Sequence, residues 1–200
     1  MEAKAVLQQY LREERAGLLS RLDGLGEREL RRPMTPTGTN LLGLVKHVAS
    51  VEIGYFGEVF DRPSGEPLPW LNDDAEADAD LWVTPNQSRE DVVALHHRSA
   101  AHADATIAAL DLDTPGVVPW WRPETRRVTL QQILAHMIAE TARHAGHADI
   151  LRELLDGRAG DVRGNLSDRT PEQWAAHRRR LQEAAEAAAV SGVVQDGDHG

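Results

Sequence analysis

The sequence predicts an all-α protein, a four-helix bundle with an additional C-terminal helix. Three observations lead to this fold class. Apolar residues recur every three or four positions over four long stretches, as in helices with one buried face. Ser, Thr or Asn precedes most of these stretches, where helix ends need capping side chains. No stretch alternates apolar and polar residues as a half-buried strand does, and no internal repeat is present.

The first two helices are separated by a segment rich in turn residues. Leucines recur at helical spacing over residues 7–25, and glycines at positions 24 and 26 end the first helix. The segment RRPMTPTGTN (31–40) follows, and its Pro, Gly, Thr and Asn residues favour turns. The second helix is expected over residues 41–60, with Thr39 or Asn40 as its N-cap.

Two long connections follow the second helix. The first covers residues 61–87 and is acidic, and ordered loops of this length are often functional. Ser88 and Asp91 form a capping-box pattern for a third helix, which ends near Leu110. The second connection covers residues 111–128.

The fourth helix is expected from the capping pair Thr129 and Gln132 to about residue 156, ending at Gly157. A fifth, alanine-rich helix begins at Pro171, because proline suits the first turn of a helix. The predicted organisation is therefore a metal-binding bundle over 1–160, a helical extension over 161–190 and a disordered tail over 191–200.

Composition excludes several classes of function. The net charge of -10 disfavours nucleic acid and anionic membranes as partners, because both repel an acidic surface. No apolar run reaches the roughly 20 residues that a membrane span needs, and the acidic start does not resemble a signal peptide. The chain has no cysteine, so disulfides and thiolate metal sites are excluded and any thiol must come from another molecule. We expect a soluble, cytoplasmic protein.

Polar residues interrupt the apolar face of the fourth helix. At about 100° per residue, Glu140, His144 and His147 fall within one narrow sector, together with Met137 and Leu151. A buried carboxylate is costly unless it is neutralised, hydrogen-bonded or bound to metal. A divalent cation would satisfy all three polar side chains.

The second helix offers a further ligand. His47 is surrounded at helical spacing by small or apolar residues, so its side chain is expected to point into the bundle. His47, Glu140 and His144 would supply three nitrogen and oxygen ligands and leave one position open, as catalytic zinc sites do.

Simpler explanations stay open for each of these residues. A plain surface hydrogen bond is the simpler explanation for Glu140 and His144, and a hydrogen-bonded core position is the simpler explanation for His47. His147 is a ligand, a hydrogen-bonding partner of a ligand or part of the pocket wall, and the last two are favoured. We expect His136 at the pocket edge. His96, His97 and His102 are expected to be solvated or to pack as polar residues, with a place in the pocket lining for one of them as the alternative. His177 and His199 indicate no function.

Two common metal motifs do not fit. A ferritin-like di-iron bundle needs Glu-x-x-His on two helices, but Glu140 is followed at that spacing by Arg143 and Glu52 by Tyr55. The His-Glu-x-x-His motif of thermolysin-type zinc proteases is absent as well.

Two segments resemble the DinB-like superfamily, in particular an uncharacterised actinobacterial branch. They are TPTGTNLLGLVKHVASVEIGYFGEVF and LQQILAHMIAETARHAGHADILRELLDG, and the resemblance covers Leu7 to Gly157. The superfamily includes mycothiol-dependent maleylpyruvate isomerases and bacillithiol transferases. Its members are four-helix bundles that hold a metal by one histidine of the second helix and two residues of the last.

The resemblance implies that His47, Glu140 and His144 are the metal ligands, a His/Glu/His set like that of the isomerase branch. His147 stands where many relatives carry glutamine, and the chain beyond Gly157 is not the larger second domain of the full isomerases. Members commonly pair, so a homodimer is expected.

These features favour a metal- and thiol-dependent transferase or isomerase that acts on a small electrophile, with mycothiol as the implied thiol. Zinc is the expected metal, with nickel or iron as alternatives. A metal-dependent hydrolase and a non-enzymatic metal- or small-molecule-binding protein are the alternative functions. His147 is the candidate catalytic residue. Candidates for the pocket rim lie in the two long connections: Trp82, Trp120, Trp121 and Arg122. For the tryptophans, capping of the bundle core is the favoured role, and solvation is the alternative for Arg122.

Overall fold

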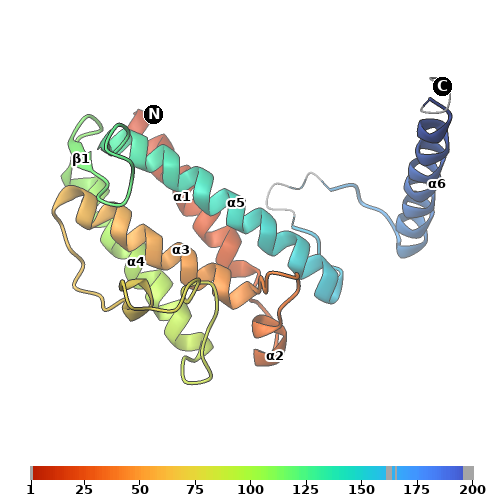
Figure 1. The fold of residues 1–200 in the computed structure, drawn as a ribbon, viewed down its shortest axis with the longest axis horizontal. Helices are drawn as coiled ribbons and strands as arrows, with labels where there is room; N and C mark the ends of the chain where they lie inside the picture. The colour runs from red at the N-terminus through yellow and green to blue at the C-terminus, as the bar shows by residue number, and fades with distance from the viewer. Residues whose placement is uncertain (1, 161–163, 165, 196–200) are drawn as a thin grey trace. The chain divides into compact units, whose positions relative to one another are not determined.

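Four long helices form the fold that the sequence predicts, and the all-α class is confirmed (Figure 1). The computed structural model describes residues 2–160, 164 and 166–195. In chain order the elements are α1 (Ala3–Ser20), α2 (Glu27–Arg31), α3 (Leu41–Phe56), the 3-10 turns η1 (Glu58–Phe60) and η2 (Pro69–Leu71), α4 (Arg89–Ala109), β1 (Pro115–Val117), β2 (Arg127–Thr129), α5 (Leu130–Asp156) and α6 (Pro171–Gln195).

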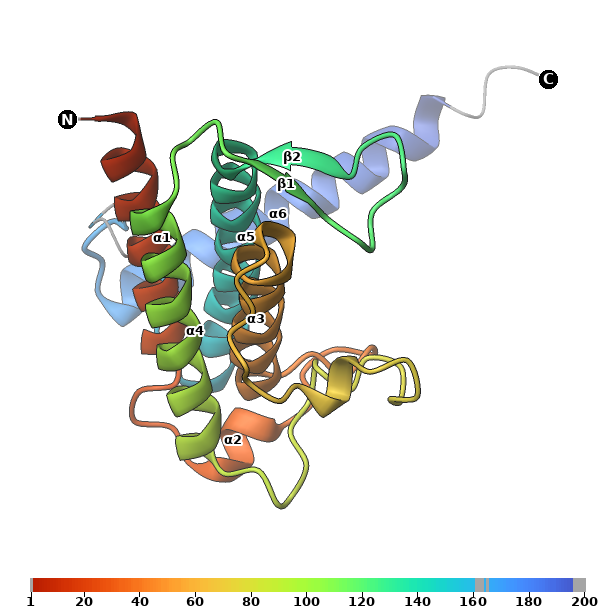
Figure 2. The ribbon, with the colours of Figure 1, turned by 90° about the vertical axis from the view of Figure 1, so that its left-hand side faces the viewer.

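The bundle is a closed ring of four helices. α1 contacts α4 and α5, and α3 contacts the same two helices from the other side (Figure 2). α1 and α5 are parallel, because Arg21 after the end of α1 pairs with Asp149 near the end of α5. α1 and α4 are antiparallel, since Lys4 at the start of α1 donates to the backbone carbonyl of Leu110 at the end of α4 at 2.6 Å.

α3 and α4 run in the same direction, and this determines the course of the chain between them. Lys46 near the start of α3 lies 3.3 Å from Gln87, just before the start of α4. A 16-residue helix is about 24 Å long, so the chain must return along the whole of α3 before α4 can begin. We call this return segment, residues 57–88, the crossover. Its length is therefore a consequence of topology.

Lys46 fastens the crossover to α3. Its side chain is only 2% exposed, and its ammonium donates to the carbonyls of Ala79 at 2.7 Å and Trp82 at 2.8 Å. The ammonium also lies 4.3 Å from the centre of the Trp70 ring. Burial lowers the pKa of Lys46, while the nearby carboxylate of Asp80 opposes the shift. A buried cation with several acceptors holds the segment in place, because releasing it would leave the charge unpaired.

Gly43 allows the crossover to touch α3 directly. A β-carbon at this position would lie 1.9 Å from the carbonyl oxygen of Leu81, which is far inside a steric clash. The same carbonyl accepts a bond of 3.2 Å from the side chain of Asn40. Asn40 also caps α3 by accepting from the amide of Gly43 at 2.8 Å, so of the two caps that the sequence offered, Asn40 is the one used.

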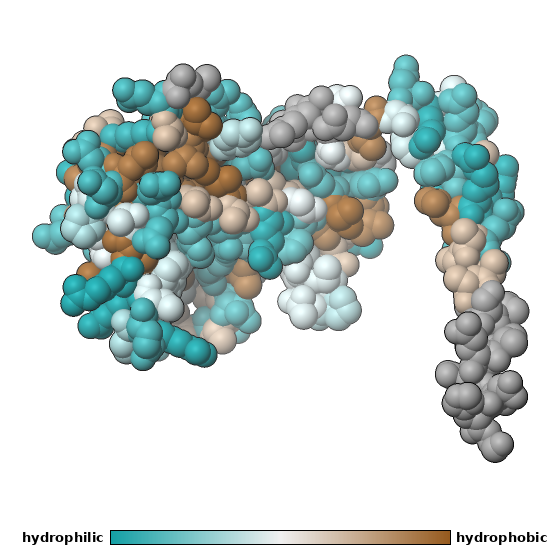
Figure 3. Space-filling view, turned by 90° about the horizontal axis from the view of Figure 1, so that it is seen from above, coloured by the Kyte–Doolittle hydropathy of each residue, from teal (hydrophilic) through white to brown (hydrophobic). Residues whose placement is uncertain are grey.

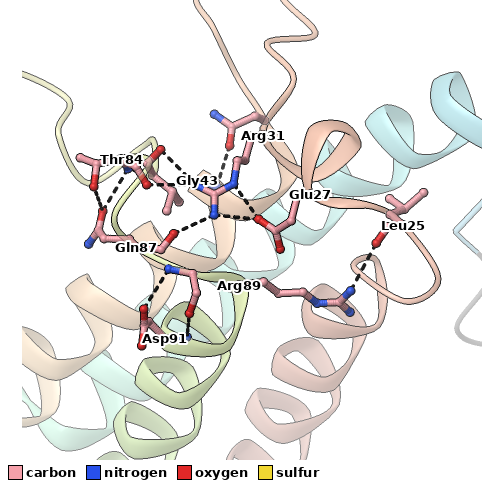
Figure 4. Close-up of polar contacts among 11 residues, drawn as sticks. Leu25, Glu27, Arg31, Gly43, Thr84, Gln87, Arg89 and Asp91 are labelled. Carbon is pink, nitrogen blue, oxygen red and sulfur yellow. Dashed lines mark hydrogen bonds and ion pairs between the residues drawn. The ribbon is translucent and has the colours of Figure 1, made fainter.

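The end of the crossover is held by α2, a five-residue helix that the sequence did not reveal (Figure 4). Arg31 donates to the carbonyl of Thr84 at 3.0 Å and to that of Gln87 at 2.7 Å, and it also pairs with Glu27. Arg89 at the start of α4 donates to the carbonyl of Leu25 at 3.3 Å. These bonds tie the loop after α1 to the start of α4.

The bundle core has two large apolar clusters, a smaller one around Ile53, and a polar layer among the helices. One large cluster includes Leu18 and Val45, and the other includes Leu11 and Met137. The polar layer contains a buried ion pair in which Arg15 donates to Glu52 at 2.7 Å. Ser99 donates to the second oxygen of Glu52 at 2.8 Å, so α1, α3 and α4 are joined at one level.

The predicted capping boxes of α4 and α5 are confirmed. Ser88 and Asp91 exchange two bonds at the start of α4, and Thr129 and Gln132 do so at the start of α5. The hairpin of β1 and β2 was not expected. It pairs three residues on each side, with Gly116 opposite Val128, and three residues are too few to show an alternating pattern.

The chain divides into two compact units, Met1–Gly160 and Asp161–Gly200. The second unit contains α6, which begins at Pro171 as the sequence predicts, and Thr170 and Gln173 form its cap. α6 continues to Gln195, so residues 191–195 of the segment expected to be a tail are helical, and residues 196–200 lie outside the described residues.

On the face drawn in Figure 3, hydrophilic side chains surround smaller groups of hydrophobic ones. None of the described helices is both long enough and apolar enough to span a bilayer.

We predict that Gly43→Ala destabilises the bundle and loosens the crossover, because its methyl group collides with a backbone carbonyl rather than a flexible side chain. Overpacking of this kind costs about 1–3 kcal/mol. Gly146→Ala is the matched control, since a β-carbon there meets nothing within 4 Å. Thermal unfolding of both variants and limited proteolysis of the crossover test this. Equal stability of the two variants would contradict it.

Candidate metal centre

Three predicted ligands meet where α3 crosses α5. His47 comes from the second turn of α3, and Glu140 and His144 occupy successive turns of α5. Nε2 of His144 lies 3.0 Å and Nε2 of His47 lies 3.4 Å from Oε1 of Glu140. One ligand atom from each residue lies within 4.8 Å of the others. The side chains are between 12% and 26% exposed, so the group is sheltered but reachable.

Asp80 orients His47 from the crossover. Its carboxylate lies 2.6 Å from Nδ1 of His47, and because a carboxylate accepts, Nδ1 carries the proton. The lone pair of His47 Nε2 then faces Oε1 of Glu140. Two acceptor atoms repel each other at this distance unless a proton or a metal ion lies between them. Metal-ligating histidines commonly have such a carboxylate on their other nitrogen.

The charges of the site are coupled. Burial alone would lower the pKa of His47, but the hydrogen bond and charge of Asp80, assisted by Glu140, raise it above its ordinary value. The hydrogen bond from His47 lowers the pKa of Asp80 against the effect of burial. Asp80 therefore remains ionised beside His47 through the neutral range.

Glu140 and His144 are shifted toward the forms that bind metal. Burial opposes ionisation of Glu140, yet the bonds from His144 and His47 lower its pKa. Burial and the neighbouring His47 lower the pKa of His144. A metal needs an ionised carboxylate and neutral imidazoles. Nδ1 of His144 is buried without a hydrogen-bond partner among the described residues, so His144 lacks the orienting contact that His47 has.

The three side chains fit a small divalent cation. In a tetrahedral zinc site with bonds of about 2.0–2.1 Å, neighbouring ligand atoms are about 3.3 Å apart. The separations from Glu140 to the two imidazoles match this spacing before any adjustment of the side chains. Nitrogen and carboxylate donors of this kind suit zinc, nickel and iron.

His147 and Trp82 lie beside the cluster at a cavity of ≈ 360 Å³. The ring centroid of His147 is 5.5 Å from that of His144, and the side chain is exposed. The cavity is also lined by Thr37, Thr39 and Asp78. Hydroxyls, a carboxylate and an imidazole at its wall suit a ligand with several hydrogen-bonding groups.

The other three candidates for the pocket rim do not line the small cavity. Trp121 donates from Nε1 to the hydroxyl of Tyr55 at 3.1 Å, and both rings pack against His136. Trp120 packs against Tyr55 and lines a second, larger cavity. Arg122 is exposed. Only Trp82 of the four candidates lines the cavity that contains His144 and His147.

The histidines of α4 stand apart from the cluster. His97 is exposed, and burial lowers the pKa of His96 to about 4, so His96 is neutral inside the bundle. Among the described residues, the cluster of ligand-type side chains that could hold a metal contains His47, Glu140 and His144. Asp80 and Tyr55 were not foreseen. Asp80 lies in the acidic run DDAEADAD, in which no spacing distinguishes one carboxylate from the others.

Comparison with known proteins identifies the family. The family model Mycothiol-S-transferase matches residues 6–157. The chain belongs to this family. The match covers the whole bundle, contains all three candidate ligands and Asp80, and agrees with the DinB-like resemblance. A search of curated proteins finds no match.

We predict that Asp80→Asn makes the stability of the metal-free family member less dependent on pH. Because the pKa of Asp80 is lowered in the folded protein, its ionised form stabilises the fold above its unfolded pKa of about 3.9. Because the pKa of His47 is raised, its protonated form stabilises the fold below its unfolded pKa of about 6.5. The His47 part is lost as pH rises through the folded pKa. The destabilisation by Asp80→Asn should thus be largest near pH 4–6.5 and smaller near pH 9.

Thermal unfolding of chelated protein across this pH range measures the effect. Asp78→Asn is the control, because Asp78 lies two positions away in the same acidic run, at the small cavity. A destabilisation by Asp80→Asn that is constant from pH 5 to pH 9 would contradict the assignment.

Proposed function

We propose that this protein is a metal-dependent S-transferase that joins a small electrophilic molecule to mycothiol. Family membership supports the thiol and the transfer reaction. The convergence of His47, Glu140 and His144 supports the metal and is the observation that carries the proposal. Zinc is the proposed ion, because the three donors leave one position open.

The chain lacks a thiol of its own, so the nucleophile must enter with the cofactor. A divalent cation at this site would lower the pKa of a thiol that binds it and so favour the thiolate at neutral pH. His47 and His144 offer lone pairs, and Glu140 offers a negative charge to the ion. Asp80 fixes the ring of His47 so that Nε2 faces the ion.

His147 is the proposed proton acceptor. It is exposed, it lines the small cavity together with His144, and the unprotonated nitrogen of a neutral imidazole can accept a proton. In the transfer the thiol loses its proton to His147 or to solvent. The sulfur then forms a bond to the electrophilic carbon, and the leaving group departs with its electron pair, or an unsaturated electrophile takes up a proton.

We predict about one metal ion per chain in purified protein and loss of that ion in His47→Ala and in Glu140→Ala. Removing one of three protein ligands weakens metal binding strongly, since the remaining donors cannot complete the site. Plasma mass spectrometry of desalted protein gives the stoichiometry and the element.

His97→Ala and Glu153→Ala are the matched controls, because both change exposed residues of the same types on α4 and α5. Wild-type protein that stays metal-free after reconstitution with zinc, nickel and iron would rule out a metal-dependent mechanism.

We predict conversion of 1-chloro-2,4-dinitrobenzene to its mycothiol conjugate, with loss of turnover after chelation and recovery after zinc is returned. Mass spectrometry of the conjugate measures the product directly. His147→Gln should lower kcat by about 10- to 100-fold with little change in metal content, as expected for loss of a general base.

Other outcomes of the same assay separate the alternatives. Turnover of ester or amide substrates without thiol would favour a hydrolase, and tight binding of small molecules without turnover would favour a non-enzymatic binding protein. The expected homodimer and the cytoplasmic location stay proposals. Light scattering of the full chain tests the former.

A further inference from the structure

A cavity of ≈ 630 Å³ lies along α3 on the opposite side of His47 from the small cavity. Val51 and Gly54 follow His47 by four and seven residues, so they share its face of the helix, about 6 and 10 Å further along the axis. The small cavity instead contacts α3 through Leu44, three residues before His47. Along α3, His47 therefore lies between the two cavities, and none of the three candidate ligands lines the larger one.

The walls of the larger cavity are mainly apolar. They include five residues from α3, the crossover and the β1–β2 connection: Val51, Gly54, Leu68, Leu71 and Trp120. Leu71 and Trp120 are 46% and 49% exposed, although both are large and apolar. A volume of this size holds a molecule with one or two aromatic rings, and apolar walls favour it over water.

Most of the polar groups at this cavity are already hydrogen-bonded or negatively charged. Ser50 donates to the carbonyl of Lys46 at 2.7 Å and accepts from Trp70 at 2.8 Å. Glu66 is paired through two bonds of 2.7 Å with Arg98. Glu58 forms no ion pair with any residue that the structure describes, and no Lys, Arg or His lines the cavity.

We propose that this cavity binds the electrophilic substrate and selects uncharged aromatic molecules over anionic ones. The identification of the bound molecule as the substrate rests on the proposed function, whereas the binding of a neutral aromatic molecule in this cavity does not. An anion would meet Glu58 without a compensating cation, in walls that do not solvate it. The smaller cavity, which His144 and His147 line, then remains for the thiol.

Two fluorescent probes with nearly the same skeleton test the charge preference. N-phenyl-1-naphthylamine is neutral, and 8-anilinonaphthalene-1-sulfonate adds one negative charge. Titration of zinc-loaded protein without thiol should give a Kd for the neutral probe about tenfold or more below that for the sulfonate. The neutral probe should also raise the KM for the electrophile without changing the KM for the thiol.

Gly54→Leu fills the cavity and Gly146→Leu is its control. A β-carbon at Gly54 lies 3.2 Å from the Trp120 ring, whereas one at Gly146 meets open space. Both changes replace a helical glycine by leucine, so the helix propensity changes alike. The neutral probe should bind roughly tenfold more weakly to Gly54→Leu and unchanged to Gly146→Leu.

Glu58→Lys tests the charge without altering the core, because Glu58 is exposed. It should strengthen sulfonate binding by at least about fivefold, and Glu153→Lys on α5 should not. If Gly54→Leu fails to fold, the measurements on Glu58→Lys test the proposal without it. Equal affinity for the two probes in the wild type, or sulfonate binding that Glu58→Lys leaves unchanged, would overturn the inference.

The two proposals fail separately. Probe binding that responds to Gly54 and Glu58 in a protein without thiol-transfer activity would refute only the proposed function. Thiol transfer in a protein whose KM for the electrophile is unaffected by the neutral probe would refute only the assignment of this cavity.

Discussion

The parallel arrangement of α3 and α4 is the constraint on which the site depends. Two adjacent parallel helices cannot be joined by a short turn, so the crossover must run back along α3 to the level of His47. The return places Asp80 at 2.6 Å from His47, and the buried ammonium of Lys46 holds the carbonyls on both sides of Asp80. A segment that topology requires thereby supplies the residue that orients a metal ligand.

The crossover also shapes what surrounds the ligands. Leu81 and Trp82 form part of the small cavity, and Leu68 and Leu71 form part of the large one. The ligands themselves come from regular helices, whose backbone is rigid, while the cavity walls come from a long connection. This division lets substrate preference change through the connection without displacing the metal-binding groups.

Helical regularity explains which parts the sequence could predict. His47, Glu140 and His144 interrupt apolar faces at fixed spacing, so their convergence followed from the period of the helix. Asp80 could not be singled out, since its position depends on the path of a loop and on a carbonyl contact at Gly43. The sequence does not single out Lys46, because its acceptors are backbone groups that a sequence does not show.

The polar layer has a consequence for the alignment of the helices. Apolar faces tolerate sliding, because one leucine contact replaces another at little cost. The pair of Arg15 and Glu52 has no such substitute, and separating a buried ion pair costs about 3–5 kcal/mol. A slide of α3 by one turn, about 5.4 Å, would break this pair and carry His47 past Glu140. The ion pair thus fixes the axial position of α3, so that His47 stays at the same height in the bundle as Glu140 and His144 of α5.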